Sequence, residues 1–133
     1  MKIIFADTYY FLPVGNAADQ GHASAAKYAA SFTGRIVTTE WVLTEVGDAL
    51  AAPAQRPRFL NLLQLIEADD SWTVVPATHE LFKRGASLFD QRADKSWSLT
   101  DCISFVVMDQ QEIVEALTAD HHFEQAGFTA LLT

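Results

Sequence analysis

Short unbroken runs of apolar residues recur along this chain and alternate with longer segments in which apolar residues are spaced as on one side of a helix. Short continuous apolar runs are typical of strands that are buried on both faces of a sheet. They predict strands at 2–6, 35–39, 72–76, 113–118 and 128–133.

The segments between these runs predict helices at 16–32, 38–52, 56–70, 77–93 and 96–111. Two of the helix starts carry capping signals. Thr78 is suited to cap the fourth helix, and Ser98 with Asp101 three residues later approaches a capping box at the start of the fifth. Strands that alternate with helices predict an α/β fold, with a parallel sheet covered by helices on both faces.

The length of the chain, 133 residues, predicts a single domain over 1–133 with one hydrophobic core. The lone Cys102 excludes an internal disulfide, and no secretory signal is recognisable at the start, so we expect a cytoplasmic protein. No apolar run approaches the roughly 20 residues that a membrane-spanning helix needs, and we therefore expect no membrane insertion.

The formal net charge is −8, and no Lys or Arg occurs between Ser96 and Thr133. This distribution excludes a protein that binds nucleic acid by coating phosphates with basic residues. Contact with nucleic acid would need another source of positive charge: a bound cation, a partner chain or the few basic residues of the middle section. Alternatively, the acidity only keeps the protein in solution.

Four acidic residues occupy positions that merit comparison. Asp7 and Asp120 each follow a predicted strand, where the ligand crevice of a parallel α/β sheet opens. Glu45 falls at the edge of the apolar side of its helix, and Asp101 lies in the first turn of a helix that is apolar almost all round. Each position also has an ordinary explanation: a turn, a cap, a boundary residue or a favourable helix dipole.

Taken together, the four acids indicate chemistry, because clustered carboxylates repel one another unless a cation lies among them. Their hard oxygen ligands suit Mg²⁺ or Mn²⁺. Such a site is typical of metal-assisted phosphoryl transfer. A cation that bridges the acidic pocket and a phosphate would also explain how a negatively charged protein can contact nucleic acid.

Four blocks, "FADTYYFL", "TTEWVLTEVGDAL", "SWSLTDCISFVVM" and "TADHHFEQAGF", together resemble the signature blocks of PIN-domain proteins, especially the VapC-like ribonucleases. The blocks occur in the family's order over nearly the whole chain. The resemblance implies a three-layer α/β/α fold with a central parallel sheet, and an endoribonuclease that depends on Mg²⁺ or Mn²⁺. It places the acidic quartet of catalytic, metal-binding residues at Asp7, Glu45, Asp101 and Asp120. It also implies an RNA substrate, an antitoxin partner and a homodimer, as in many relatives.

Two positions depart from the family pattern. Many relatives have a small hydroxyl residue two positions after the first acid, where this chain has Tyr9, which would crowd the pocket or alter substrate fit. Some relatives carry a further acid two positions after the fourth, where this chain has His122. These departures keep two alternatives open: a PIN-like binding module with weak catalysis, and a PIN nuclease outside any toxin–antitoxin pair.

The remaining candidate residues favour structural roles. His121 and His122 lack the spacing of a zinc site and are expected at the rim of the pocket, while Cys102 is expected to be a small buried hydrophobe. In the segment 59–66 the apolar residues cover more of the predicted helix than the single narrow stripe that would face the core. This pattern predicts an exposed apolar surface for a dimer or an antitoxin.

Overall fold

The computed structural model describes residues 1–15 and 31–132, so the helix predicted at 16–32 lies almost entirely outside the described residues. Within the described part, five strands form one parallel sheet in the order β3-β2-β1-β4-β5. The strands are β1 (Ile3–Ala6), β2 (Arg35–Thr39), β3 (Trp72–Val75), β4 (Glu115–Leu117) and β5 (Thr129–Ala130). Every strand predicted from the sequence is present, although β4 and β5 are shorter than expected.

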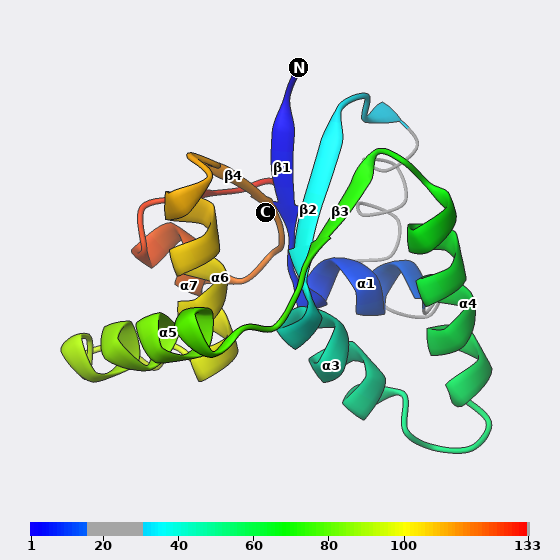
Figure 1. Cartoon of the computed structure of the whole chain (residues 1–133), viewed down its shortest axis with the longest axis horizontal. Helices are drawn as coiled ribbons and strands as arrows, with labels where there is room; N and C mark the ends of the chain where they lie inside the picture. Colours follow the sequence, from blue (N-terminus) through cyan, green and yellow to red (C-terminus); the bar gives the residue numbers. More distant parts are fainter. Residues whose placement is uncertain (16–30, 133) are drawn as a thin grey trace.

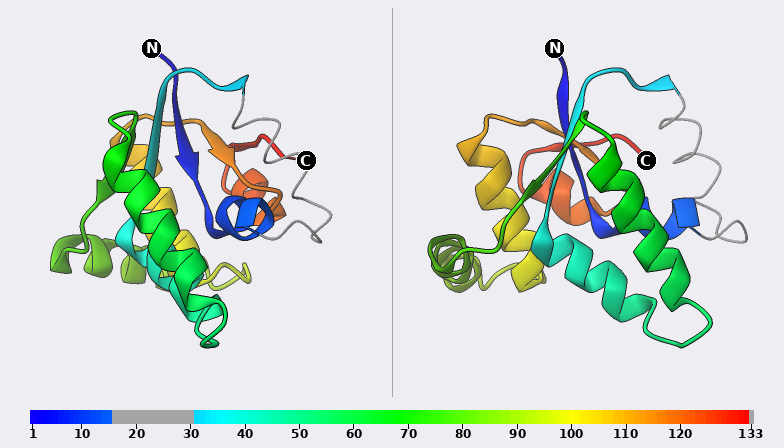
Figure 2. Two further views of the ribbon diagram at one scale, coloured as in Figure 1. Left: turned by 90° about the vertical axis from the view of Figure 1, so that its right-hand side faces the viewer. Right: turned by 45° about the vertical axis from the view of Figure 1, so that its right-hand side comes forward.

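The helices are α1 (Thr8–Gly15), α3 (Glu40–Ala49), α4 (Arg56–Ala68), α5 (His79–Gln91), α6 (Leu99–Gln110) and α7 (His121–Gln125). Helices α1 and α4 lie on one side of the sheet, and α6 lies on the other with α5 packed against it (Figures 1 and 2). Helix α3 contacts α1, α4 and α6. The predicted α/β/α arrangement around a parallel sheet is therefore confirmed.

Local capping sets the boundaries of the helices. The Thr39 side chain accepts a hydrogen bond from the Val42 amide, so α3 begins two residues later than its apolar spacing suggested. Thr78 caps α5 as predicted, through the Leu81 amide. Such caps satisfy amide groups that have no partner within the helix.

Helix α1 was not predicted from the sequence. It begins directly after Asp7, and its sequence, TYYFLPVG, is apolar on nearly every side and contains Pro13. A segment of this kind shows no amphipathic period. The side chains of Tyr10 and Phe11 are buried against Trp72 at the edge of the sheet, which indicates that tertiary packing stabilises this helix.

The centre of the core lies between the sheet and α6. Phe5 of β1 is fully buried, as are the side chains of Ile103 and Met108 on α6, and Phe105 makes edge contacts with Trp97 and Phe123. Helix α5 approaches α6 closely at Gly85, where an added Cβ would overlap the Ile103 side chain. The buried α6 predicted from the sequence is confirmed, and its first turn is held at the carboxyl edge of the sheet.

The exposed side of α4 carries apolar residues of the predicted segment 59–66 next to polar ones such as Asn61 and Gln64. Leu60 and Leu65 are 56% and 70% exposed, whereas Ile66 is buried against the core. The structure contains one chain, so a dimer or antitoxin at this face remains a prediction. Among the described residues, none of the helices combines the length and the apolar character needed to cross a bilayer.

Candidate active site

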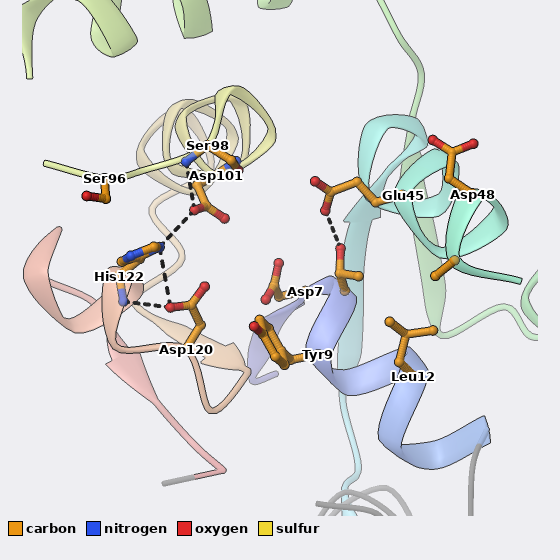
Figure 3. A pocket seen from close by; sticks show the side chains of 12 residues that line it. Asp7, Tyr9, Leu12, Glu45, Asp48, Ser96, Ser98, Asp101, Asp120 and His122 are labelled. Atoms are coloured by element: carbon orange, nitrogen blue, oxygen red, sulfur yellow. Dashed lines mark hydrogen bonds and ion pairs between the residues drawn. The ribbon is translucent and has the colours of Figure 1, made fainter. Parts of the chain in front are cut away.

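The four predicted acids line one pocket of about 500 Å³ at the carboxyl edge of the sheet. Each comes from a different segment: Asp7 follows β1, Glu45 lies on α3, Asp101 on the first turn of α6, and Asp120 between β4 and α7 (Figure 3). Parallel strands end at the same edge of a sheet, so residues that are distant in the sequence meet there. Thr8, Tyr9, Leu12, Asp48, Ala49, Ser96, Ser98 and His122 complete the lining.

Asp7 is the most deeply placed of these acids, with 3% of its surface exposed. Burial, followed by the negative charges of Asp101 and Asp120, raises the pKa of its carboxyl to about 7, against the lowering effect of hydrogen bonds from the Thr8 amide and the Thr118 hydroxyl. A carboxylate in this position is strongly destabilised as an anion. Nearby positive charge would therefore favour its ionised form.

Thr118 joins the two acids that follow strands. Its hydroxyl donates to Asp7 Oδ2 at 3.0 Å and accepts from the Asp120 amide, also at 3.0 Å. The side chain is fully buried at the end of β4. Because one hydroxyl holds both residues, the position of Asp7 relative to the start of α7 is fixed.

Asp101 both caps α6 and lines the candidate active site. Its carboxylate accepts from the Ser98 amide at 3.1 Å, and its own amide donates to the Ser98 hydroxyl, which completes a capping box. The same carboxylate oxygen lies 3.1 Å from His122 Nδ1. Asp120 likewise caps α7, since its Oδ1 accepts from the His122 amide at 2.9 Å. The caps hold both carboxylates at the pocket.

Glu45 lies across the pocket from Asp101 and Asp120 (Figure 3). Its Oε1 accepts a hydrogen bond of 2.6 Å from the Thr8 hydroxyl. The charges that act on the carboxyl of Asp7 are those of Asp101 and Asp120, so the three aspartates form the electrostatic centre of the site. Glu45 stands at its border.

The rim of the pocket contains the residues that departed from the family pattern. Tyr9 is 54% exposed, and its pKa is raised by partial burial and by the charge of Asp120 and the other acids. Trp97 is buried just before α6, and its Nε1 donates to Gln125 Oε1 at 3.0 Å, which ties the loop before α6 to α7. Cys102 is buried, and burial followed by the charge of Asp101 raises its pKa to about 11. The thiol is thus unsuited to act as a nucleophile.

A divalent cation fits the donors that this pocket offers. Three aspartate carboxylates provide hard oxygen ligands, and a cation beside the buried Asp7 would oppose the effects of burial and of the neighbouring acids that raise its pKa. Potential ligand atoms of Asp120, His121 and His122 also lie within 4.8 Å of one another. Asp7, Glu45, Asp101, Asp120 and His122 line the pocket with groups that can bind such an ion.

Sequence reasoning did not identify two residues of the site. Thr8 and Thr118 supply the hydroxyl groups that hold Glu45 and Asp7, yet Thr118 is 111 residues from Asp7 in the sequence. The only signal was position, because Thr118 ends a predicted strand and Thr8 follows the first acid directly. Single threonines at such places are too common to be singled out.

The comparisons with known proteins agree with this geometry. The 23S rRNA-specific endonuclease VapC20 of Mycobacterium tuberculosis is 27% identical to this chain, over 95% of each protein. The crystal structure of M. tuberculosis VapC20, described as a toxin that cleaves the sarcin-ricin loop, superimposes with a TM-score of 0.86 at 26% identity, covering 95% of this chain and 96% of that one.

A structure of FitAcB from Neisseria gonorrhoeae shares the fold, with a TM-score of 0.64 at 13% identity over 96% of this chain and 94% of that one. The sequence profile of the PIN domain matches residues 4–129, from β1 to β5. This chain therefore belongs to the PIN domain family.

Proposed function

We propose that this protein is an endoribonuclease that depends on a divalent cation, and the toxin of a toxin–antitoxin pair. The observation that carries the proposal is the convergence of three aspartates, from three distant segments, on one pocket at the carboxyl edge of the sheet. The similarity to VapC20, a 23S rRNA-specific endonuclease, along almost the full length of both chains supports RNA as the substrate.

In this proposal Asp7, Asp101 and Asp120 hold the cation, which is Mg²⁺ or Mn²⁺. The bound ion would offset the negative charge of the phosphate and supply Lewis-acid catalysis. Thr118 keeps Asp7 and Asp120 at a fixed separation, and the capping box keeps Asp101 directed at them. This preorganisation means that little reorientation is needed when substrate binds.

In this proposal Glu45 orients the attacking water. The Thr8 hydroxyl binds Oε1, so the rotamer of the side chain is fixed while Oε2 remains available to accept a proton or a hydrogen bond. Its place across the pocket from Asp101 and Asp120 leaves space between them for a phosphate. A carboxylate in hydrogen-bond reach of a water is a suitable general base.

We further propose that α4 binds the antitoxin, or a second copy of the chain, through its exposed apolar residues. Leu65 is exposed and lines a groove with Tyr10, Leu62 and Trp72, and Leu60 is exposed and lines a second groove with Gly47 and Phe59. Burial of such side chains in a complex would be favourable, at about 25 cal/mol for each Å² removed from water.

The experiment that tests the function is cleavage of RNA by the purified protein and by Asp7→Asn. This substitution removes a charged ligand with little change in volume. Asp109→Asn, on the exposed end of α6, is the matched control. Ribosomal RNA is the first substrate to test, with Mn²⁺, with Mg²⁺ and with chelator.

We expect cleavage that needs the metal, that Asp109→Asn retains and that Asp7→Asn loses. Full cleavage by Asp7→Asn would refute the site. Intact RNA with every metal, together with a tight complex with another protein, would favour a binding module. Cleavage of DNA in place of RNA would refute the substrate.

A further inference from the structure

The imidazole of His122 points into the space between two of the acids. Its Nδ1 lies 3.1 Å from Asp101 Oδ2 and 3.5 Å from Asp120 Oδ1 (Figure 3). The side chain is 21% exposed and lines the pocket. A hydrogen bond from the His122 amide to Asp120 Oδ1 holds the backbone and the neighbouring carboxylate together. One ring nitrogen is therefore fixed beside two carboxylates that belong to different segments.

These separations suit ligands of one ion. Neighbouring ligands about 2.1 Å from an octahedral ion lie about 3 Å apart, and those of a tetrahedral ion lie about 3.4 Å apart. Of the two distances from His122 Nδ1, 3.1 Å falls in this range and 3.5 Å lies just above it. No large movement of the ring is needed for the nitrogen and both carboxylates to share a cation.

We propose that His122 is a metal ligand through Nδ1, and that it makes the site select Mn²⁺ and the later first-row ions over Mg²⁺. The inference rests on the proposed function, because it concerns the cation held by Asp101 and Asp120. It differs from the acidic quartet in chemistry, since it adds a nitrogen ligand to a set of oxygens.

The selectivity follows from the preferences of the ions. Mg²⁺ prefers oxygen ligands and gives up its waters reluctantly. Imidazole nitrogen is a softer ligand, and the affinity of such sites rises from Mn²⁺ along the first-row series. A site of carboxylates alone discriminates less between these ions. His122 therefore lowers the affinity of the site for Mg²⁺ relative to Mn²⁺, whereas an acidic residue at this position would not.

The neighbouring His121 supplies the matched control. Its side chain is 72% exposed, and its Nδ1 lies 3.8 Å from Asp120 Oδ1. It does not belong to the lining of the pocket, although one of its potential ligand atoms lies within 4.8 Å of those of Asp120 and His122. It is the same residue type, one position earlier on the same short helix, so a change at His121 tests whether any histidine at the start of α7 produces the effect.

The experiment is pulsed electron paramagnetic resonance on the full chain loaded with Mn²⁺ alone, with histidines labelled with ¹⁵N. Coupling between Mn²⁺ and a directly bound histidine nitrogen is expected in the unmodified chain and in His121→Ala, and its loss is expected in His122→Ala. This readout does not depend on cleavage of RNA. Circular dichroism checks that each variant is folded.

A competition titration measures the selectivity. We expect His122→Asp, which returns an oxygen ligand, to need at least about tenfold less Mg²⁺ to displace bound Mn²⁺ than the unmodified chain needs, since a change close to a metal costs about 10- to 100-fold in affinity. His121→Ala should match the unmodified chain. An unchanged ratio in His122→Asp would overturn the selectivity, and it remains measurable even if His122→Ala fails to fold.

The outcomes separate this inference from the proposed function. Binding of Mn²⁺ that Asp7→Asn weakens, but without histidine coupling, would overturn His122 as a ligand and leave the metal site in place. Coupling that persists in His122→Ala would do the same. Absence of Mn²⁺ binding at millimolar concentrations would refute both the ligand and the metal-dependent function.

Discussion

The buried carboxyl of Asp7 predicts that the metal-free protein loses stability as the pH rises. Its pKa is about 7 in the folded chain, against an ordinary value of 3.8. Between these values the folded state holds a proton that the unfolded state has released, so the free energy of unfolding falls with pH. The loss begins near pH 4 and is complete above about pH 7.

The size of the effect follows from the same values. The difference between 3.8 and about 7, at about 1.4 kcal/mol for each pH unit, gives about 4 kcal/mol. Asp7→Asn removes this effect because the amide remains neutral. The substitution also disturbs the hydrogen bond from the Thr118 hydroxyl, at a cost of about 1 kcal/mol. At pH 8 without metal, the variant should therefore be more stable by about 3 kcal/mol.

Urea unfolding between pH 4 and pH 8, with chelator present, measures the difference between the two proteins. Ionisable groups distant from Asp7 affect both proteins alike and cancel in the comparison, whereas Asp101 and Asp120 are coupled to Asp7. Added Mn²⁺ or Mg²⁺ should stabilise the unmodified protein at pH 8, because it binds the folded state, and should stabilise Asp7→Asn much less. A stability difference that is constant across this pH range would refute the assignment of the raised pKa to Asp7.

Three substitutions test other parts of the structure. Thr118→Val removes the hydroxyl that serves Asp7 and the start of α7, and should cost about 1–3 kcal/mol in urea unfolding; unchanged stability would contradict this role. Gly85→Ala places a Cβ against the Ile103 side chain and 3.2 Å from its Cα, so it should destabilise the protein by about 1–3 kcal/mol, and an unchanged midpoint of thermal unfolding would count against the close approach of α5 to α6. Tyr9→Ala should raise the KM for RNA about tenfold, because the exposed ring can stack on an unpaired base, whereas Tyr9→Phe should not; equal effects of the two would exclude stacking.

Much of the fold could be predicted because its signals are local. Unbroken apolar runs identified the five strands, and capping residues such as Thr78 and Ser98 placed two helix starts within a few residues. Asp7 and Asp120 could be expected together, since parallel strands end at one edge of a sheet. Helix α1 escaped prediction because a segment that is apolar on every side has no helical period.

The contacts within the site depend on pairings between distant segments. The hydrogen bonds from Thr8 to Glu45 and from Thr118 to Asp7 join residues 37 and 111 positions apart. The approach of His122 to Asp101 spans 21 positions. No sequence period encodes such distances. Asp101 and Asp120 also show that an ordinary capping role does not exclude a place in the site, because both residues cap a helix and line the pocket.

Metal-dependent cleavage of RNA at the acidic pocket is tested most directly with ribosomal RNA, by comparing the purified protein and Asp7→Asn with Mn²⁺ and with chelator. We expect specific cleavage that needs Mn²⁺ and that Asp109→Asn retains. Asp7→Asn should reduce the rate by at least about 100-fold, as expected for loss of a group that acts in the transition state. Cleavage that persists in chelator, or that Asp7→Asn performs at the full rate, would contradict this expectation.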